Sequence, residues 1–257
     1  MKIYSLTKKE ILTSMAAFLL AATAITLGTT TLSKAVTTAA EPREIPVYSV
    51  DTEEKKVSIS FDAAWGNEQT AELLDILDRY NVKTTFFLVG QWVDNYPDSV
   101  KDIAKRGHDV ENHSDTHAHL PQLSNADKEK EITNCNEKIK SLTGKSPTLF
   151  RPPYGDYDND TVKEVKSLGM YCTQWSIDSL DWKDLSPQEI TRRVTKNLQN
   201  GDIILLHNGA KNTPAALPQI IEEIQAQGFE IVKMTELIPT GDYTTDHTGK
   251  MYLSESD

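Results

Sequence analysis

The sequence VSISFDAAWG, residues 57–66, shows the pattern on which the fold of this chain depends. An apolar, β-branched stretch ends on an acidic residue, Asp62. Further stretches of apolar, β-branched and aromatic residues follow at regular intervals, as is typical of buried parallel strands. The sequence predicts seven strands: Val57–Phe61, Thr84–Val89, Asp109–His113, Thr148–Arg151, Tyr171–Ser176, Asp202–His207 and Phe229–Met234.

Helical patterns separate these strands. Residues 71–80 repeat leucine and isoleucine at helical spacing. The segment Ser186-Pro187-Gln188-Glu189 has the form of a capping box with proline at the first helical position. Strands that alternate with helices predict a parallel α/β fold, and residues 55–240 are expected to form a single domain.

Periodicity does not separate a closed barrel from an open sheet, but the polar residues help. Five of them lie at or just after the predicted C-terminal ends of strands. A barrel gathers these ends into one pocket, whereas an open sheet spreads them along an edge. We therefore expect an α/β barrel whose pocket contains Asp62, His113, Arg151, Asp178 and His207.

Composition excludes some functions. The chain has 257 residues and a net charge of −11. The first forty residues carry four lysines and one glutamate, which leaves the remainder at −14. A nucleic-acid-binding protein is expected to have a basic face, so this class is excluded, and a neutral polymer is a better partner than a polyanion. Cys135 and Cys172 could form a disulfide, but both lie in apolar patterns and are expected to be free, buried thiols.

The N-terminus has the pattern of an export signal. Lys8 and Lys9 precede residues 11–28, which are uncharged. This pattern predicts a signal peptide or signal anchor over residues 1–28, with a buried core helix as the alternative. The protein is then secreted to the cell wall or attached to the membrane by this segment only. Residues 29–54 are expected to be a linker and residues 241–257 a flexible tail.

Two histidines have the spacing of metal ligands. His113 and His117 are four residues apart, and on a helical turn this spacing places both imidazoles on one face. The alternative is a pair of solvated histidines near a helix start. Asp62 could accept a proton from a metal-bound water or bind the metal, although a single strand-end aspartate is more often a cap or turn residue.

The other polar groups fit proton transfer and sugar binding. His207 follows an apolar strand and could protonate a leaving amine, or it could be a structural, hydrogen-bonded histidine. Arg151 precedes two prolines, so its guanidinium should be held in place, either to orient a carboxylate or in a structural ion pair. Trp65, Trp182 and Tyr154 could form an apolar wall for sugar rings. Trp92 and Trp175 are expected to be packing residues.

The order and spacing of these motifs resemble the polysaccharide deacetylase family, the carbohydrate esterases of type four. The resemblance covers residues 55–240 and implies a distorted (β/α) barrel of about seven strands, with fewer than eight units. It also implies metal-dependent removal of acetyl groups from an N-acetylated glycan such as peptidoglycan, with zinc as the expected metal. The implied roles are Asp62 as catalytic base, His207 as general acid, Arg151 and Asp181 as the groups that orient and tune them, the Tyr154 N–H as oxyanion donor, and His113 and His117 as metal ligands.

One residue departs from the family. Ala63 stands where the family usually has a metal-binding aspartate, and the segment around it resembles the sporulation-associated PdaB-type branch. A catalytic zinc site normally has three protein ligands. Glu111 could replace the missing ligand, since strand alternation places it on the side of His113; otherwise Asp62 becomes a ligand, or the site is weak or empty. The resemblance thus leaves two hypotheses, a metal-dependent N-deacetylase and a carbohydrate-binding relative without turnover.

Overall fold

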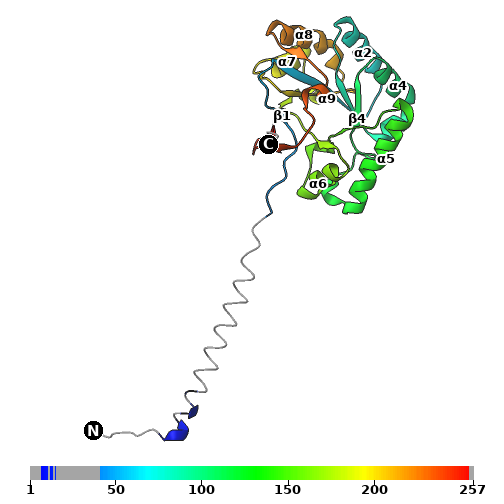
Figure 1. Ribbon diagram of the computed structural model, residues 1–257. Helices are drawn as coiled ribbons and strands as arrows, with labels where there is room; N and C mark the ends of the chain where they lie inside the picture. Colours follow the sequence, from blue (N-terminus) through cyan, green and yellow to red (C-terminus); the bar gives the residue numbers. More distant parts are fainter. Residues whose placement is uncertain (1–6, 11, 14, 16–40, 255–257) are drawn as a thin grey trace. The chain divides into compact units, whose positions relative to one another are not determined.

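The computed structural model describes residues 7–10, 12, 13, 15 and 41–254 (Figure 1). The chain divides into two compact units, residues 1–43 and 44–257. In the first unit, residues 8–10, 12, 13 and 15 are helical. The predicted export segment, residues 1–28, lies for its larger part outside the described residues. Among those that are described, no helix has the length and apolar character needed to cross a membrane.

The second unit is built on a parallel sheet that curls into a distorted barrel, as the sequence predicts. Its strands are ordered β6-β5-β4-β3-β2-β8-β7, and β9 pairs with the beginning of β2. Each predicted strand is present, most of them shorter than expected, and β7 is an addition. The strands are β2 (Lys56–Ala63), β3 (Thr85–Leu88), β4 (Asp109–Asn112), β5 (Leu149–Phe150), β6 (Tyr171–Cys172), β7 (Ile177–Asp178), β8 (Ile203–His207) and β9 (Glu230–Ile231).

The central strand is β2, which pairs with β3, β8 and β9. All its residues after Lys56 are buried, so both faces of the strand are covered. Phe61 stacks on Phe86 of β3 with ring centroids 4.9 Å apart. In the register of β2 and β8, Asp62 lies beside His207. The two residues expected to transfer protons therefore come from neighbouring strands at the same end of the barrel.

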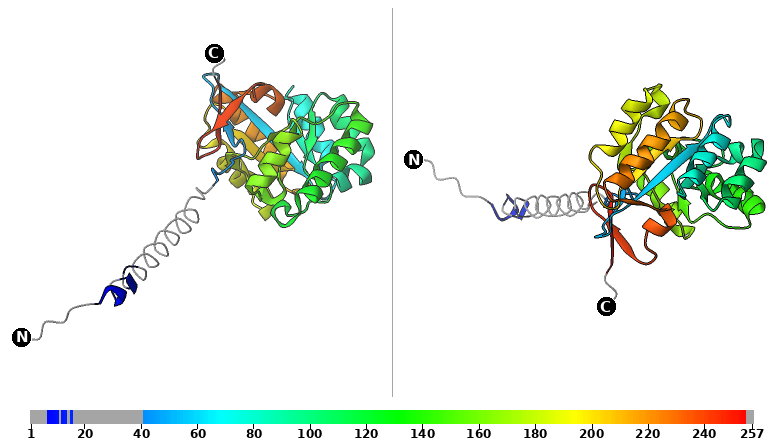
Figure 2. Two further views of the ribbon diagram at one scale, coloured as in Figure 1. Left: turned by 60° about the horizontal axis from the view of Figure 1, so that its bottom comes forward. Right: turned by 90° about the horizontal axis from the view of Figure 1, so that it is seen from above.

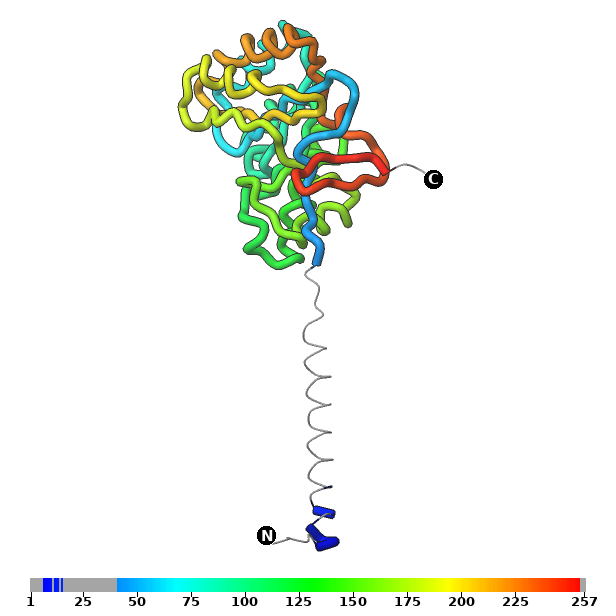
Figure 3. The backbone as a smooth tube through the Cα atoms, turned by 90° about the vertical axis from the view of Figure 1, so that its left-hand side faces the viewer, coloured from blue at the N-terminus to red at the C-terminus, as the bar shows by residue number. Residues whose placement is uncertain are grey.

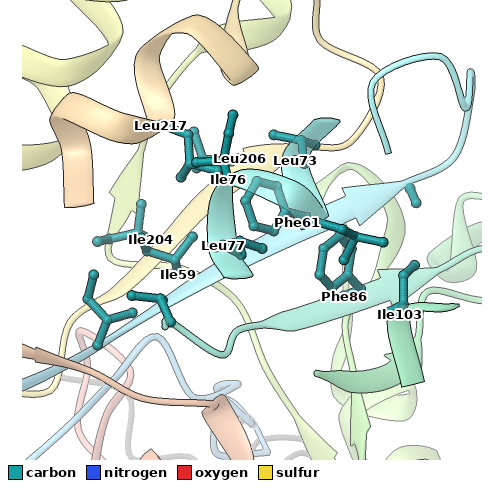
Figure 4. Packing of buried hydrophobic residues seen from close by; sticks show 14 of the residues in the cluster. Ile59, Phe61, Leu73, Ile76, Leu77, Phe86, Ile103, Ile204, Leu206 and Leu217 are labelled. Atoms are coloured by element: carbon teal, nitrogen blue, oxygen red, sulfur yellow. The ribbon is translucent and has the colours of Figure 1, made fainter. Parts of the chain in front are cut away.

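Helices surround the sheet in the views of Figures 1 and 2. Apolar side chains of α2, including Leu73 and Leu77, pack in one cluster with Ile59, Phe61 and Leu206 (Figure 4). Full burial of one such side chain stabilises the fold by about 1.5–3 kcal/mol. The helices are α2 (Thr70–Arg79), α3 (Gly90–Asn95), α4 (Pro97–Lys105), α5 (Asn125–Thr143), α6 (Asn159–Ser167), α7 (Pro187–Thr195), α8 (Thr213–Ala226) and α9 (Met234–Leu237), with 3-10 turns η1 (Leu120–Gln122), η2 (Pro153–Gly155) and η3 (Asp181–Lys183).

Two local predictions are confirmed. The side chain of Ser186 accepts from the N–H of Glu189, and the Glu189 carboxylate accepts from the N–H of Ser186, which forms the capping box of α7. Cys135 and Cys172 are free and buried. Both thiols lie in apolar clusters, and burial raises their pKa, so they act as small hydrophobic residues.

The barrel does not close between β6 and β7, and a segment near residue 48 fills the gap. Val47 forms a bridge with Thr173 after β6, and Ser49 forms one with Asp202 before β8. This segment includes β1 (Ser49–Val50), which pairs with β11 (Lys250–Leu253); β11 in turn pairs with β10 (Tyr243–Thr245). Figure 3 shows the C-terminal hairpin beside the first strand.

The predicted linker and tail are therefore wrong over residues 44–50 and 243–253. Val47 and Met251 are fully buried, in a cluster beneath the small sheet. No local pattern indicates these strands, because β1 has two residues and its partner strand lies about 200 positions away. Such a strand is defined by its partner rather than by its own pattern.

We predict that Met251→Ala lowers the free energy of unfolding by about 2–5 kcal/mol, the usual loss for a buried methionine. The neighbouring Leu253, which is 50% exposed, provides the control. Leu253→Ala should change stability by less than about 0.5 kcal/mol. Chemical denaturation measures both, and equal stability of the two variants would show that the C-terminal hairpin does not belong to the core.

Candidate active site

A pocket of about 400 Å³ opens at the C-terminal ends of the strands. It brings together most of the residues that the sequence predicts for the site. Arg151 and Asp181 are fully buried and contact two residues that line the pocket, Asp62 and His207 respectively. The pocket is lined by Asp62, Trp65, His113, His117, Tyr154, Trp175, Asp178, Trp182, Leu205 and His207.

Asp62 is held by Arg151, as expected of a guanidinium fixed by two following prolines. Arg151 Nη1 donates to Asp62 Oδ1 at 2.6 Å. Its Nη2 donates to Ser60 Oγ at 2.9 Å and to the Gln174 carbonyl at 3.1 Å. Burial alone would raise the pKa of Asp62, but the charge and hydrogen bond of Arg151, together with the charges of His113 and His207, hold this pKa below its ordinary value. Asp62 is therefore ionised at neutral pH.

His207 is held by Asp181 in a second ion pair. His207 Nδ1 lies 2.7 Å from Asp181 Oδ1. Asp181 Oδ2 also accepts from the His207 backbone N–H at 2.8 Å and from Thr213 Oγ1 at 2.6 Å, so the carboxylate cannot turn away. Burial alone would lower the pKa of His207, but the hydrogen bond and charge of Asp181 raise it above its ordinary value.

His113 and His117 also meet, with ring centroids 5.0 Å apart. His113 Nδ1 lies 2.7 Å from the carbonyl oxygen of Arg151, so Nδ1 carries the hydrogen and Nε2, 3.4 Å from Asp62 Oδ2, has a lone pair. Burial lowers the pKa of His113, and it lowers that of His117 to about 4. Both imidazoles are neutral at pH 7, the form in which histidine binds metals.

The expected helical turn between these histidines is wrong. Ser114 and His117 both have positive φ, 68° and 61°, and the segment forms a tight loop after β4. Its backbone is fixed by side chains instead. Ser114 N–H donates to Asn112 Oδ1 at 2.7 Å, and His117 N–H donates to Ser114 Oγ at 3.0 Å.

Glu111, the third metal ligand that the sequence allows, does not line the pocket with His113 and His117. Its carboxylate accepts from the N–H groups of Thr148 and Leu149, at 2.8 and 2.7 Å, at the start of β5. It lines a different cavity, at the N-terminal ends of β4 to β6, where burial raises its pKa to about 8. The sequence argument failed because β4 ends at Asn112, so alternation no longer relates Glu111 to His113.

The donor set does not fit a metal site with three protein ligands. Ala63 is fully buried in the apolar cluster and offers no ligand, and Asp62 is bound to Arg151. Within the described part of the chain, no group of three or more histidine, cysteine, aspartate or glutamate side chains could hold a metal ion. His108 accepts a hydrogen bond from the Thr84 N–H, and His119 contacts Asp156. Neither histidine therefore serves as the third metal ligand.

Aromatic side chains form the rim of the pocket. Trp65, Trp182 and Tyr154 are each about half exposed, which is unusual for large apolar groups in a folded protein. Tyr154 stacks on His119 at 4.0 Å between ring centroids, and its φ of 61° turns the backbone sharply at η2. Trp175, expected to be a packing residue, also lines the pocket. Trp92 is buried as expected, and its Nε1 donates to the Gly66 carbonyl.

The fold and the site define an α/β-barrel protein with two ion-paired groups in one pocket at the C-terminal ends of its strands. The sequence pattern of the polysaccharide deacetylase family matches residues 49–173. The peptidoglycan-N-acetylglucosamine deacetylase of Bacillus cereus is 36% identical over 204 residues, which are 77% of this chain and 95% of that protein. The chain belongs to the polysaccharide deacetylase family. Deacetylases of this family are generally metal-dependent.

Of two further relatives, one is uncharacterized and the other is named a pseudoenzyme. An uncharacterized protein of Bacillus subtilis, YlxY, is 32% identical over 75% of this chain, which spans only 60% of YlxY. A family 4 carbohydrate esterase pseudoenzyme of Bacillus anthracis has been crystallised as a mutant with restored enzymatic activity. This mutant is 33% identical, with a TM-score of 0.73, over 75% of this chain and 70% of that one. The family thus includes both active and inactive members.

The pairing of His207 with Asp181 has a consequence that can be measured. In Asp181→Asn the pKa of His207 should fall below the ordinary value of about 6.5. Burial lowers this pKa, and in the variant the charge of Asp181 no longer counteracts it. In the wild-type protein the raised pKa means that this pair stabilises the fold below about pH 6.5, and the contribution is lost as the pH rises through the pKa of folded His207. NMR titration of the imidazole gives both values.

Asp178→Asn serves as the control for this titration. Asp178 also raises the pKa of His207, but only by charge, and it is the weakest of the causes. A shift as large in Asp178→Asn as in Asp181→Asn would show that the 2.7 Å contact is not what holds the proton.

Proposed function

We propose that this chain hydrolyses the N-acetyl groups of a cell-wall glycan of the peptidoglycan type. One observation carries the proposal: two ion-paired groups line the same pocket. One is a carboxylate paired with a buried arginine, and the other is a histidine paired with a buried aspartate. The printed activity of the Bacillus cereus relative supports the choice of bond and polymer.

The two pairs place each group in its reactive form over the same pH range. The pKa of Asp62 is depressed and that of His207 is raised. Between the two values, Asp62 is ionised and can accept a proton, while His207 is protonated and can donate one. A site that hydrolyses an amide needs both forms at the same time.

The proposed reaction uses these groups in order. Asp62 accepts a proton from the attacking water as oxygen bonds to the acetyl carbon. The N–H of Tyr154, a residue of the η2 turn, donates to the carbonyl oxygen as it becomes negative. His207 protonates the nitrogen as the carbon–nitrogen bond breaks, which releases acetate and the amine. The half-exposed rings of Trp65, Trp182 and Tyr154 contact the sugar.

The proposed place of action is outside the cytoplasm. Lys8 and Lys9 before an uncharged stretch support export by a signal peptide or signal anchor. The negative charge of the folded part suits a neutral glycan. A role in sporulation remains a prediction from the resemblance to the PdaB-type branch.

The second candidate function is glycan binding without turnover. It is favoured by Ala63, which leaves two histidines without a third metal ligand. The pocket, its aromatic rim and both ion pairs are equally compatible with recognition alone. The similarity to a pseudoenzyme whose activity a mutation restores supports this second candidate. Acetate release separates the two functions, because only the first requires bond cleavage.

We predict that Asp62→Asn reduces acetate release from N-acetylglucosamine oligomers by about 10²–10⁴-fold, the usual contribution of a general base. Asparagine keeps the shape but cannot accept the proton, so oligomer binding should be retained. Arg79→Ala, an exposed change at the end of α2, is the control and should leave release unchanged. Equal rates in Asp62→Asn and the parent would exclude Asp62 as the base.

Restoring the missing carboxylate tests the second candidate. We predict that Ala63→Asp raises both bound zinc and acetate release, because it adds the third ligand that a catalytic zinc site requires. Ala63→Asn has the same size and no charge, and it should do neither. Metal analysis and acetate assays check the result, and melting curves show that each variant is folded. If Ala63→Asp binds zinc but releases no acetate, the ion pairs and the metal together do not make the pocket catalytic.

A further inference from the structure

Trp65 lies against the imidazole of His207, a contact that the proposed reaction does not use. The two rings stack with their centroids 5.4 Å apart and their planes inclined by 29°. These values are within the usual geometry of offset aromatic pairs. The indole also lines the pocket and is about half exposed, so only part of it is covered by His207.

The position of Trp65 is restrained by the segment that follows His207 and by a neighbouring helix. Gly209 approaches so closely that a Cβ atom there would lie 2.5 Å from the Trp65 carbonyl oxygen and 2.9 Å from Trp65 Nε1. The next residue, Gly66, has a positive φ of 65°, and its carbonyl accepts from Trp92 Nε1 of α3 at 2.6 Å. The loop that carries Trp65 is therefore fixed on both sides, and the indole is held beside the imidazole.

The hydrogen bond to Asp181 does not by itself fix the imidazole of His207. It holds Nδ1 at 2.7 Å from Asp181 Oδ1, which restrains one atom of the ring. The tilt of the ring plane about this contact needs a second restraint, and the indole of Trp65 supplies it by covering one face. An aromatic ring also favours a protonated imidazole, because a cation within about 6 Å of a ring centroid is attracted to it.

We propose that Trp65 is a positioning residue for His207, whose imidazole it holds in plane so that the nitrogen not bound to Asp181 faces the pocket. Asp181 and Trp65 then have different tasks. The carboxylate fixes one nitrogen of the ring, and the indole sets the direction of the other. The use of His207 as an acid rests on the proposed function, whereas its contact with Trp65 does not.

Nuclear magnetic resonance of the full chain with isotope-labelled histidine tests this role. We expect Trp65→Leu to lower the pKa of His207 by roughly 0.5–1, the size of a cation–π contact at a partly exposed site. Leucine keeps an apolar cover over the imidazole but has no aromatic face, and the charges of Asp181, Asp62 and Asp178 are unchanged. The Nδ1–H of His207 should also exchange faster with water, because the ring is less firmly held against Asp181.

Trp65→Phe and Trp182→Leu are the matched controls. Phenylalanine keeps an aromatic face, so both the pKa and the exchange rate of His207 should return most of the way to the parental values. Trp182 is another half-exposed tryptophan of the rim, and among the described residues it has no ring contact with His207. Trp182→Leu should therefore change neither quantity. The inference is wrong if Trp65→Leu leaves the pKa or the exchange rate unchanged, if Trp65→Phe restores neither, or if Trp182→Leu shifts them as strongly.

Acetate release from the hexamer of N-acetylglucosamine separates this inference from the proposed function. If the parent releases acetate, Trp65→Leu should lower kcat; a rise in KM with kcat unchanged indicates a sugar contact only and overturns the inference. If the parent releases none while the pKa of His207 depends on Trp65, the proposed deacetylation fails and the positioning role stands. If release requires Asp62 but His207 is the same in Trp65→Leu, only the positioning role fails.

Discussion

The guanidinium of Arg151 is the group on which the site depends. It is fully buried and lies 4.1 Å over the ring of Phe87, in the middle of the barrel. A charge in such a place is tolerated only if it is paired and hydrogen-bonded. Asp62, Ser60 and the Gln174 carbonyl accept from its two terminal nitrogens, while Nε has no hydrogen-bond partner among the described residues. Its own carbonyl accepts from His113, so one residue fixes both the carboxylate and an imidazole.

The proposed proton transfer and the proposed metal binding depend on different residues of this pocket. The ion pairs of Asp62 and His207 depend on buried partners, and none of these partners is Ala63. An alanine at position 63 therefore leaves the positions of Asp62 and His207 intact. Relatives that are named deacetylases and one that is named a pseudoenzyme share this barrel, which agrees with such independence. Fold alone does not decide between them.

The sequence predicted the parts of the structure that depend on local patterns. Long apolar strands, the cap at Ser186 and the five polar strand ends are of this kind, and so is the convergence of Asp62 and His207. It failed where a residue's position depends on distant neighbours. Glu111 accepts hydrogen bonds at the start of β5, Trp175 lines a pocket whose other walls come from distant segments, and β1 pairs with β11 at the other end of the chain. No window of sequence contains these partners.

The distance along the chain between paired segments constrains how the protein folds. Ser60 Oγ donates to the Ile204 carbonyl across 144 positions, and Thr245 Oγ1 donates to the Ile45 carbonyl across 200. Closing such long loops costs chain entropy before stabilising contacts have formed. Folding is therefore slow compared with that of a helical protein. While a ribosome still holds the last quarter of the chain, β2 lacks its β8 neighbour and Asp62 lacks His207. The geometry of the candidate active site is thus completed late in the life of each molecule.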